Sequence, residues 1–134
     1  MNKYLEFDAG SPASVPVPAE QSRYMLYLHV PFCETLCPYC SFNRIPFDPG
    51  LAARYFQSLR TEIAMYKDLG YTFDSLYIGG GTPTILPEEL GRTVETVRKY
   101  WDIRQASGET NPNHLTPAIT GRLKGVGINR LSVG

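Results

Sequence analysis

The chain has 134 residues and carries 13 Lys or Arg side chains against 13 Asp or Glu side chains, so its formal net charge is zero. This neutrality disfavours a nucleic-acid partner, which requires a basic surface, and a hydrophobic content of 43% argues against wholesale disorder. No apolar run approaches the roughly 18 residues that span a bilayer, and the N-terminus lacks a secretory signal, so we expect a cytoplasmic protein without a membrane span.

Residues 1–22 are polar and rich in proline, and we expect them to form an extended N-terminal arm with no core of its own. Residues 23–134 are expected to form the ordered domain. Its first element is the aliphatic and aromatic run YMLYLHV at 24–30, which Pro31 stops. Such a run predicts a buried strand. A loop that contains all three cysteines of the chain follows this strand.

The middle of the chain alternates between helix and strand patterns. Apolar residues at helical spacing over 51–69 predict a helix, and Gly70 stands where its C-terminal cap is needed. The run FDSLYI at 73–78 predicts a strand that ends at the glycines 79–81. A second helix is predicted over 87–100, because a proline suits its first turn and two glutamates follow at the positive end of its dipole.

The same alternation continues to the end of the chain. A strand is predicted over 102–109, a short helix over 116–124 with Thr116 as its N-cap, and a final strand over 128–133. This order predicts parallel βα units with right-handed crossovers. A complete eight-fold barrel takes about 250 residues. We therefore expect an α/β fold whose units form roughly the first half of a TIM-type barrel, truncated, with a small open α/β domain as the alternative.

The segment CETLCPYC places Cys33, Cys37 and Cys40 at the spacing C-x3-C-x2-C. An odd, clustered set of cysteines does not fit a secreted disulfide framework. Three thiolates on one loop can hold three irons of a four-iron cluster, which leaves the fourth iron open to an external ligand. The natural candidate is the amino-carboxylate end of S-adenosylmethionine (SAM). Two alternatives stay open: a structural zinc site completed by His29, and buried thiols without a ligand.

Further motifs accompany the cysteine triplet in a fixed order. They are YLHVPFC at 27–33, GGGTPT at 79–84, ETNP at 109–112 and GINRLS at 127–132. Together the five motifs resemble the radical SAM superfamily, and in particular the branch that contains oxygen-independent coproporphyrinogen III oxidase and the bacterial haem chaperone. The resemblance runs from about Tyr24 to the last residue. It implies that the half-barrel is the N-terminal portion of a radical SAM domain.

The resemblance also implies roles for individual residues. Cys33, Cys37 and Cys40 match the ligands of a [4Fe-4S] cluster. Glycines allow a ligand to approach the backbone closely, and a carboxylate accepts charge-assisted hydrogen bonds from an ammonium group or from ribose hydroxyls. No catalytic residue is assigned, and His29 is left without a role. The positions that match SAM contacts are Tyr27, Tyr39, Gly80, Gly81, Thr82 and Glu109.

By the same resemblance, the cluster and SAM would generate a 5'-deoxyadenosyl radical for oxidoreductase chemistry on a porphyrinogen or haem, with an electron donor such as flavodoxin or ferredoxin. Phe42 stands where the porphyrinogen-oxidising members carry a fourth cysteine. A haem-transfer role, and the haem-opening role of related haem-utilisation proteins, therefore stay open beside the oxidase reaction. We expect the half-barrel alone to be inactive toward its substrate.

Overall fold

The computed structural model describes residues 14–20 and 22–134, so most of the expected arm lies outside the described residues. The α-helices are α1 (Pro49–Asp68), α2 (Pro87–Tyr100) and α3 (Pro117–Gly125), and the 3-10 helices are η1 (Pro83–Ile85) and η2 (Pro112–His114). The strands are β1 (Tyr24–Val30), β2 (Phe32–Cys33), β3 (Ile45–Pro46), β4 (Phe73–Gly80), β5 (Gln105–Thr110) and β6 (Arg130–Val133).

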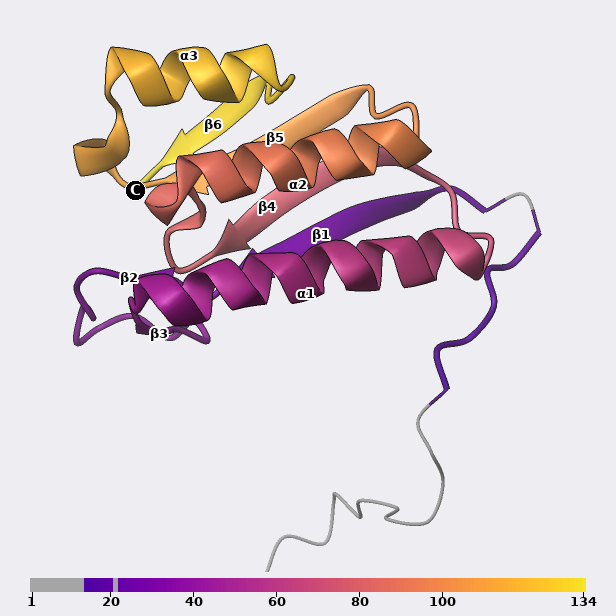
Figure 1. Cartoon of the computed structure of the whole chain (residues 1–134), viewed down its shortest axis with the longest axis horizontal. Helices are drawn as coiled ribbons and strands as arrows, with labels where there is room; N and C mark the ends of the chain where they lie inside the picture. Colours follow the sequence, from indigo (N-terminus) through magenta and orange to yellow (C-terminus); the bar gives the residue numbers. More distant parts are fainter. Residues whose placement is uncertain (1–13, 21) are drawn as a thin grey trace, which may run out of the picture.

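Four strands form one parallel sheet in the order β1-β4-β5-β6 (Figure 1). The helices α1 and α2 lie side by side across one face of this sheet. All four strands run in the same direction, so their carboxyl ends meet at one edge, which is also where the chain ends. This arrangement confirms the α/β fold with parallel βα units that the alternation of patterns predicts.

The core lies between the sheet and the two long helices. In β1, Leu26, Leu28 and Val30 are buried against the helices, whereas Met25 and Tyr27 are 60% and 50% exposed. The prediction of a buried strand is therefore right for one face of β1 and wrong for the other. The described helices cover only one side of the sheet, so the alternate side chains of β1 face the opposite side.

The three α-helices lie where the helix signals predict them, with bounds that agree to within two residues. The α2 helix spans the predicted residues, and the Thr116 hydroxyl accepts a hydrogen bond from the backbone of Ile119 at the start of α3. The α1 helix begins earlier than predicted, because an Asp48 carboxylate oxygen accepts the Leu51 N–H at 2.6 Å and caps it at Pro49. Gly70 follows this helix with φ of 87°, a left-handed conformation that favours glycine.

The strand bounds differ more from the predictions. The β4 strand continues through Gly79 and Gly80, which pair with His29 and Val30 of β1 through their backbones alone. The β5 and β6 strands begin later than predicted, at Gln105 and Arg130. The short parallel pair of β2 and β3 was not predicted, because two residues a side are too few to show a pattern.

An ion pair holds the two long helices together. The Arg60 guanidinium lies 2.8 Å from the Glu89 carboxylate and donates to the Thr93 hydroxyl at 3.2 Å. The side chains of Arg60 and Glu89 are 23% and 16% exposed, so the pair is largely shielded from water. Glu89 also bonds Arg92, one turn along the same helix. This contact fixes how α1 lies beside α2 over the sheet.

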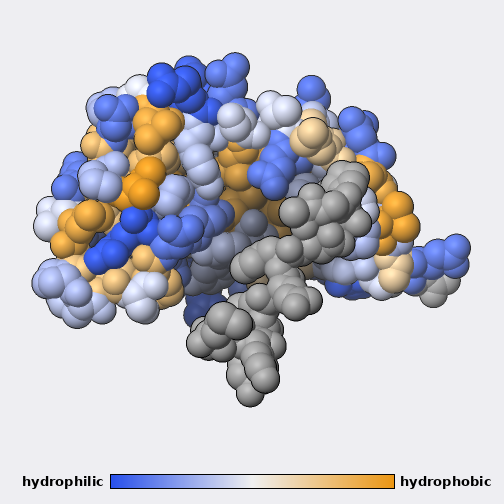
Figure 2. All heavy atoms as spheres, turned by 90° about the horizontal axis from the view of Figure 1, so that it is seen from below, coloured by the Kyte–Doolittle hydropathy of each residue, from blue (hydrophilic) through white to orange (hydrophobic). Residues whose placement is uncertain are grey.

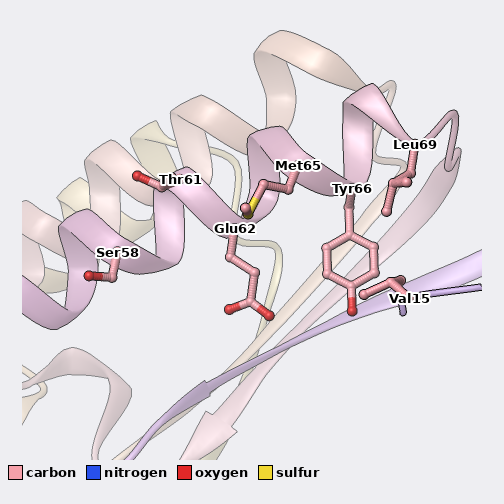
Figure 3. A pocket seen from close by; sticks show the side chains of 7 residues that line it. All are labelled: Val15, Ser58, Thr61, Glu62, Met65, Tyr66 and Leu69. Carbon is pink, nitrogen blue, oxygen red and sulfur yellow. The ribbon is translucent and has the colours of Figure 1, made fainter. Parts of the chain in front are cut away.

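The molecular face seen from below mixes hydrophobic and hydrophilic side chains (Figure 2). The described part of the arm contacts the segment that follows the C-terminal end of α1. There the Tyr71 hydroxyl donates to the backbone oxygen of Pro16 at 2.6 Å. Val15, Met65 and Tyr66 are among the residues that line a pocket of about 430 Å³ there (Figure 3). Within the described part of the chain, no helix combines the length and the apolar character that crossing a bilayer requires.

Candidate functional site

A cavity of about 410 Å³ opens at the carboxyl edge of the parallel sheet. Parallel α/β folds place their ligand sites at this edge. The cavity brings together all but one of the predicted site residues, whereas the pocket beside the arm contains none of them. Its predicted lining residues are Cys33, Cys37, Cys40, Tyr39, Gly80, Gly81, Thr82 and Glu109.

The cysteine loop begins and ends in the short strand pair. Cys33 lies in β2 and is buried, and its backbone oxygen accepts the Phe47 N–H at 2.9 Å. Cys37 and Cys40 are half-buried, and the Cys40 N–H bonds the Cys37 oxygen at 3.1 Å in a tight turn. The Arg44 guanidinium donates to the same oxygen. All three thiols are free, and the loop directs them to one cavity.

The chemistry of this donor set fits a four-iron cluster with three protein ligands. Among residues 14–20 and 22–134, no three His, Cys, Asp or Glu side chains are gathered as closely as a single metal ion requires. Ligands of a four-iron cluster bind separate irons, so their sulfurs lie farther apart than the ligands of one ion. His29 has both ring nitrogens in hydrogen bonds, so the alternative zinc set with this histidine is not formed.

The glycine loop after β4 packs directly against Cys33. A Cβ atom on Gly81 would lie 2.7 Å from the Cys33 sulfur, and one on Gly80 would lie 2.6 Å from the backbone oxygen of Val30. Gly80 also has φ of 124°, which side chains rarely tolerate. The Thr82 hydroxyl donates to the Cys33 sulfur at 3.7 Å. This wall of the cavity therefore consists of backbone and one hydroxyl, so a ligand can lie close to it.

Glu109 is held at the end of β5 by two donors. The Tyr77 hydroxyl donates to one carboxylate oxygen at 2.6 Å, and the Gly80 N–H donates to the other at 3.2 Å. The hydrogen bond to Glu109 raises the pKa of Tyr77 above its ordinary value, and burial and the charge of Glu109 act in the same direction. The carboxylate is thus fixed at the cavity with lone pairs still available to a ligand.

The two tyrosines that the resemblance singles out occupy different surroundings. Tyr39 lines the cavity and is 87% exposed, and its hydrogen bond with Cys37 is the main reason that its pKa is raised. Tyr27 does not line the cavity. Its ring stacks on that of Tyr77, with the centroids 6.0 Å apart and the planes 27° from parallel. Tyr27 therefore lies beside the site, on the sheet face opposite α1 and α2.

Sequence reasoning missed several residues of this site. Tyr77 could have been found, because it stands two residues before Gly79 and so shares its face of β4. Arg44 follows the cysteine motif without a motif of its own, and its Nε atom is buried without a hydrogen-bond partner in the described structure. Such an atom indicates a missing partner, which the ligand of the cavity could supply. The further lining residues are Thr35, Phe42, Arg44, Thr110, Asn111, Ser132, Val133 and Gly134.

Comparison with known proteins gives a consistent result. The profile of the radical SAM superfamily matches residues 27–134. The heme chaperone HemW of Bacillus subtilis is 34% identical over 115 residues, which cover 81% of this chain and 30% of that protein. The oxygen-independent coproporphyrinogen III oxidase of Bradyrhizobium diazoefficiens is 34% identical over 117 residues, which cover 81% and 26%. A solved structure also matches, that of the coproporphyrinogen III oxidase HemN from Escherichia coli, which is described as a radical SAM enzyme. The TM-score is 0.72 and the sequence identity is 30%, and the match covers 84% of this chain and 27% of HemN.

The chain spans about a quarter to a third of the length of the curated relatives that it matches. Proteins named heme chaperone and proteins named oxidase match it at the same identity of 34%, so the comparisons do not separate the two functions. The family profile covers most of the described domain, including the cysteine loop, the glycine loop and Glu109. The chain belongs to the radical SAM superfamily.

Proposed function

We propose that Cys33, Cys37 and Cys40 hold a [4Fe-4S] cluster and that the adjoining cavity binds SAM. One observation supports this proposal above all: three free thiols from one loop line the same cavity as the glycine loop and Glu109. The contacts proposed for SAM are Tyr27, Tyr39, Gly80, Gly81, Thr82 and Glu109.

When bound, the reduced cluster and SAM supply one-electron cleavage of a carbon–sulfur bond and a 5'-deoxyadenosyl radical. The residues of the chain bind SAM and orient it beside the cluster. The bare backbone of Gly80 and Gly81 admits the ligand beside Cys33, and Glu109 accepts hydrogen bonds from its ammonium group or its ribose hydroxyls. The exposed ring of Tyr39 offers an aromatic surface on which a nucleobase can stack.

The substrate class that we propose is a porphyrinogen or haem, as in the names of the related proteins. For a porphyrinogen, the chain would belong to an oxidoreductase that receives its electrons from a flavodoxin or ferredoxin in the cytoplasm. A haem-transfer protein is the second candidate. Phe42 favours it, because this exposed, apolar side chain lines the cavity where the porphyrinogen-oxidising members carry a fourth cysteine.

Anaerobic reconstitution of the chain with iron and sulfide tests the cluster. The expected product contains four irons and four sulfides per chain, shows the broad visible absorption of a cluster, and changes its spectrum when SAM is added. Cys37→Ala should abolish assembly, whereas Ser41→Ala, four residues away on the same exposed loop, should leave it intact. Uptake of one zinc ion without sulfide, or full assembly in Cys37→Ala, would contradict the proposal.

A second experiment separates the two candidate functions. Because the half-barrel alone is expected to be inactive, this experiment uses the chain within a protein of the full length of its curated relatives. This protein is reconstituted, reduced with dithionite and mixed with SAM, together with either coproporphyrinogen or haem. Loss of coproporphyrinogen with release of 5'-deoxyadenosine supports the oxidase and counts against the transfer protein. Stoichiometric haem binding without loss of coproporphyrinogen supports the transfer protein and counts against the oxidase.

A further inference from the structure

A charged contact joins the cysteine loop to the segment that follows β5. The Nε2 atom of His114, at the end of η2, lies 3.6 Å from a carboxylate oxygen of Glu34, the residue after Cys33. The η2 helix comes directly after the end of β5, where Glu109 lines the cavity. The contact therefore connects the wall of the cavity that carries the first cysteine with the wall that carries the glutamate.

The His114 end of this contact is firmly held by the fold. Its side chain is 13% exposed, and its Nδ1 atom lies 3.0 Å from the hydroxyl oxygen of Thr84 in η1. Thr84 is buried, and its hydroxyl lies 2.8 Å from that of Thr110 at the end of β5. The backbone N–H of His114 bonds the Asn111 oxygen at 2.9 Å. The imidazole is thus fixed by η1, β5 and its own turn.

The hydrogen bonds also orient the imidazole toward the loop. A carboxylate oxygen can only accept, so the neutral ring is most favourable with its proton on Nε2, the atom that faces Glu34. Nδ1 then has a lone pair and accepts the Thr84 proton, and Thr84 in turn accepts from Thr110. Each donor in this row points toward the cysteine loop. The two buried threonines therefore keep a donor of the ring directed at the carboxylate.

The Glu34 end of the contact is less constrained. Its side chain is 65% exposed, and it lies in the loop over 34–44, whose two ends are joined by the hydrogen bonds between β2 and β3. Within the loop, the Arg44 guanidinium donates to the Cys37 backbone oxygen and supports the second half. A charged contact at an exposed site contributes little to the stability of a whole fold. Its effect is confined to the first half of the loop, which it holds.

We propose that His114 is a positioning residue that, through Glu34, holds the first half of the cysteine loop in the shape that receives the cluster. This inference rests on the proposed function, because the loop needs a fixed shape only if its thiolates bind a common group. Cys33 is buried against the glycine loop, so its thiol meets solvent only when this part of the structure opens. His114 does not line the cavity and acts through the loop alone.

Alkylation of Cys33 by iodoacetamide in the cluster-free chain, resolved by site with mass spectrometry, measures this opening. His114→Asn keeps a side-chain group that can bond Thr84 but is too short to reach the loop, and Glu34→Gln removes the charge at the other end. Each variant should label Cys33 about two- to five-fold faster than the unsubstituted chain does, which is the range that an exposed ion pair supports. Cys37 and Cys40 are half-buried already and should change less.

Two comparisons separate positioning from folding. The double variant of His114→Asn with Glu34→Gln should label Cys33 no faster than either single variant, because each substitution already breaks the same contact. His114→Gln carries an amide that can extend to Glu34 and donate to it, so it should restore most of the protection. Asn113→Ala, on the exposed neighbouring residue of η2, is the matched control and should leave labelling unchanged.

Several results would overturn the inference. Unchanged labelling of Cys33 in both single variants would show that the contact does not hold the loop. Additive acceleration in the double variant would show that the two residues act separately. An equal rise at all three cysteines would show that His114 supports the fold in general rather than the loop.

Loss of iron from the reconstituted chain to a chelator distinguishes the inference from the function on which it rests. His114→Asn should lose iron about two- to five-fold faster than the unsubstituted chain, and Asn113→Ala should not. If the cluster assembles and His114→Asn loses iron no faster, the inference fails while the cluster site stands. If the unsubstituted chain takes up no iron and sulfide, the proposed function fails, and the labelling of Cys33 still decides whether His114 holds the loop.

Discussion

Gly81 lies so close to Cys33 that a methyl group on the glycine would stand 2.7 Å from the cysteine sulfur. The same methyl group would lie 2.7 Å from the backbone oxygen of Phe32, which cannot rotate away. The glycine loop and the first cysteine are therefore one packed unit. Any residue larger than glycine at this position must move the thiol, the loop or both.

Gly81→Ala is accordingly expected to impair cluster assembly. The added methyl displaces the Cys33 sulfur, and overpacking of this kind destabilises a fold by about 1–3 kcal/mol. Iron and sulfide content after reconstitution measures the effect. Gly121→Ala in α3 is the matched control, because nothing lies within 4 Å of its new methyl, and it should stabilise the chain by up to about 1 kcal/mol. Normal iron content in Gly81→Ala would contradict this prediction, because it would mean that the glycine loop shifts to accommodate the methyl group.

The raised pKa of Tyr77 predicts that the free energy of unfolding decreases at high pH. Its folded pKa is raised above the ordinary value of about 10 by the bond to Glu109, so folding favours the protonated phenol. This contribution is complete below about pH 10 and is lost as the pH rises through the folded pKa. Tyr77→Phe removes the titrating group, so its free energy of unfolding should fall less steeply above about pH 10. Denaturant titrations of both chains at several pH values measure this, and identical slopes would refute it.

The ion pair between α1 and α2 should be worth more than a surface pair. Glu89 is only 16% exposed in the pair, so Arg60→Ala takes the α1 partner away from a largely shielded carboxylate, and we expect a loss of about 1–3 kcal/mol in the free energy of unfolding. The other partner of Glu89 is Arg92, whose side chain is 63% exposed. Arg92→Ala should therefore lower the free energy of unfolding by less than about 1 kcal/mol. Urea unfolding of the two variants gives the comparison. Equal losses would mean that water screens both pairs alike.

The start of α1 depends on one side chain. The Asp48 carboxylate accepts the Leu51 N–H at 2.6 Å, and loss of such a cap costs about 1 kcal/mol. Asp48→Ala should therefore lower the unfolding free energy by about that amount, whereas Asp48→Asn should retain most of the cap. Thermal melts followed by circular dichroism test both. An unchanged midpoint in Asp48→Ala would indicate that packing alone sets the start of the helix.

Local signals explain which parts of the fold could be predicted. The bounds of α2 follow from Pro87 and two acidic residues in its first turn, all of which act within one helix turn. The exposed face of β1 could not be foreseen, because both faces of YMLYLHV are apolar or aromatic, and only the placement of the helices decides which is covered. Strand bounds shifted for a similar reason, since parallel pairing depends on distant backbone rather than on neighbouring residues.

The candidate site also has residues that the sequence predicts and residues that only the fold brings together. The cysteine triplet and the glycine run are continuous motifs, so the sequence alone could nominate them, and the structure brings both to one cavity. The bond between Tyr77 and Glu109 joins residues 32 positions apart, and it exists only because β4 and β5 are neighbours in register. Arg44 enters the cavity through the fold of the loop, which no local pattern specifies.

The pairing of β2 with β3 bears on the order in which a cluster would assemble. The N–H groups of Ile45 and Phe47 bond the oxygens of Pro31 and Cys33, at 2.8 and 2.9 Å, so the ends of the loop over 34–44 are joined by the polypeptide itself. Closing a loop of this length costs conformational entropy, and the backbone hydrogen bonds between β2 and β3 offset part of that cost. In the cluster site that we propose, Cys33 would serve as a fixed first anchor, and the turn with Cys37 and Cys40 would settle around the incoming iron.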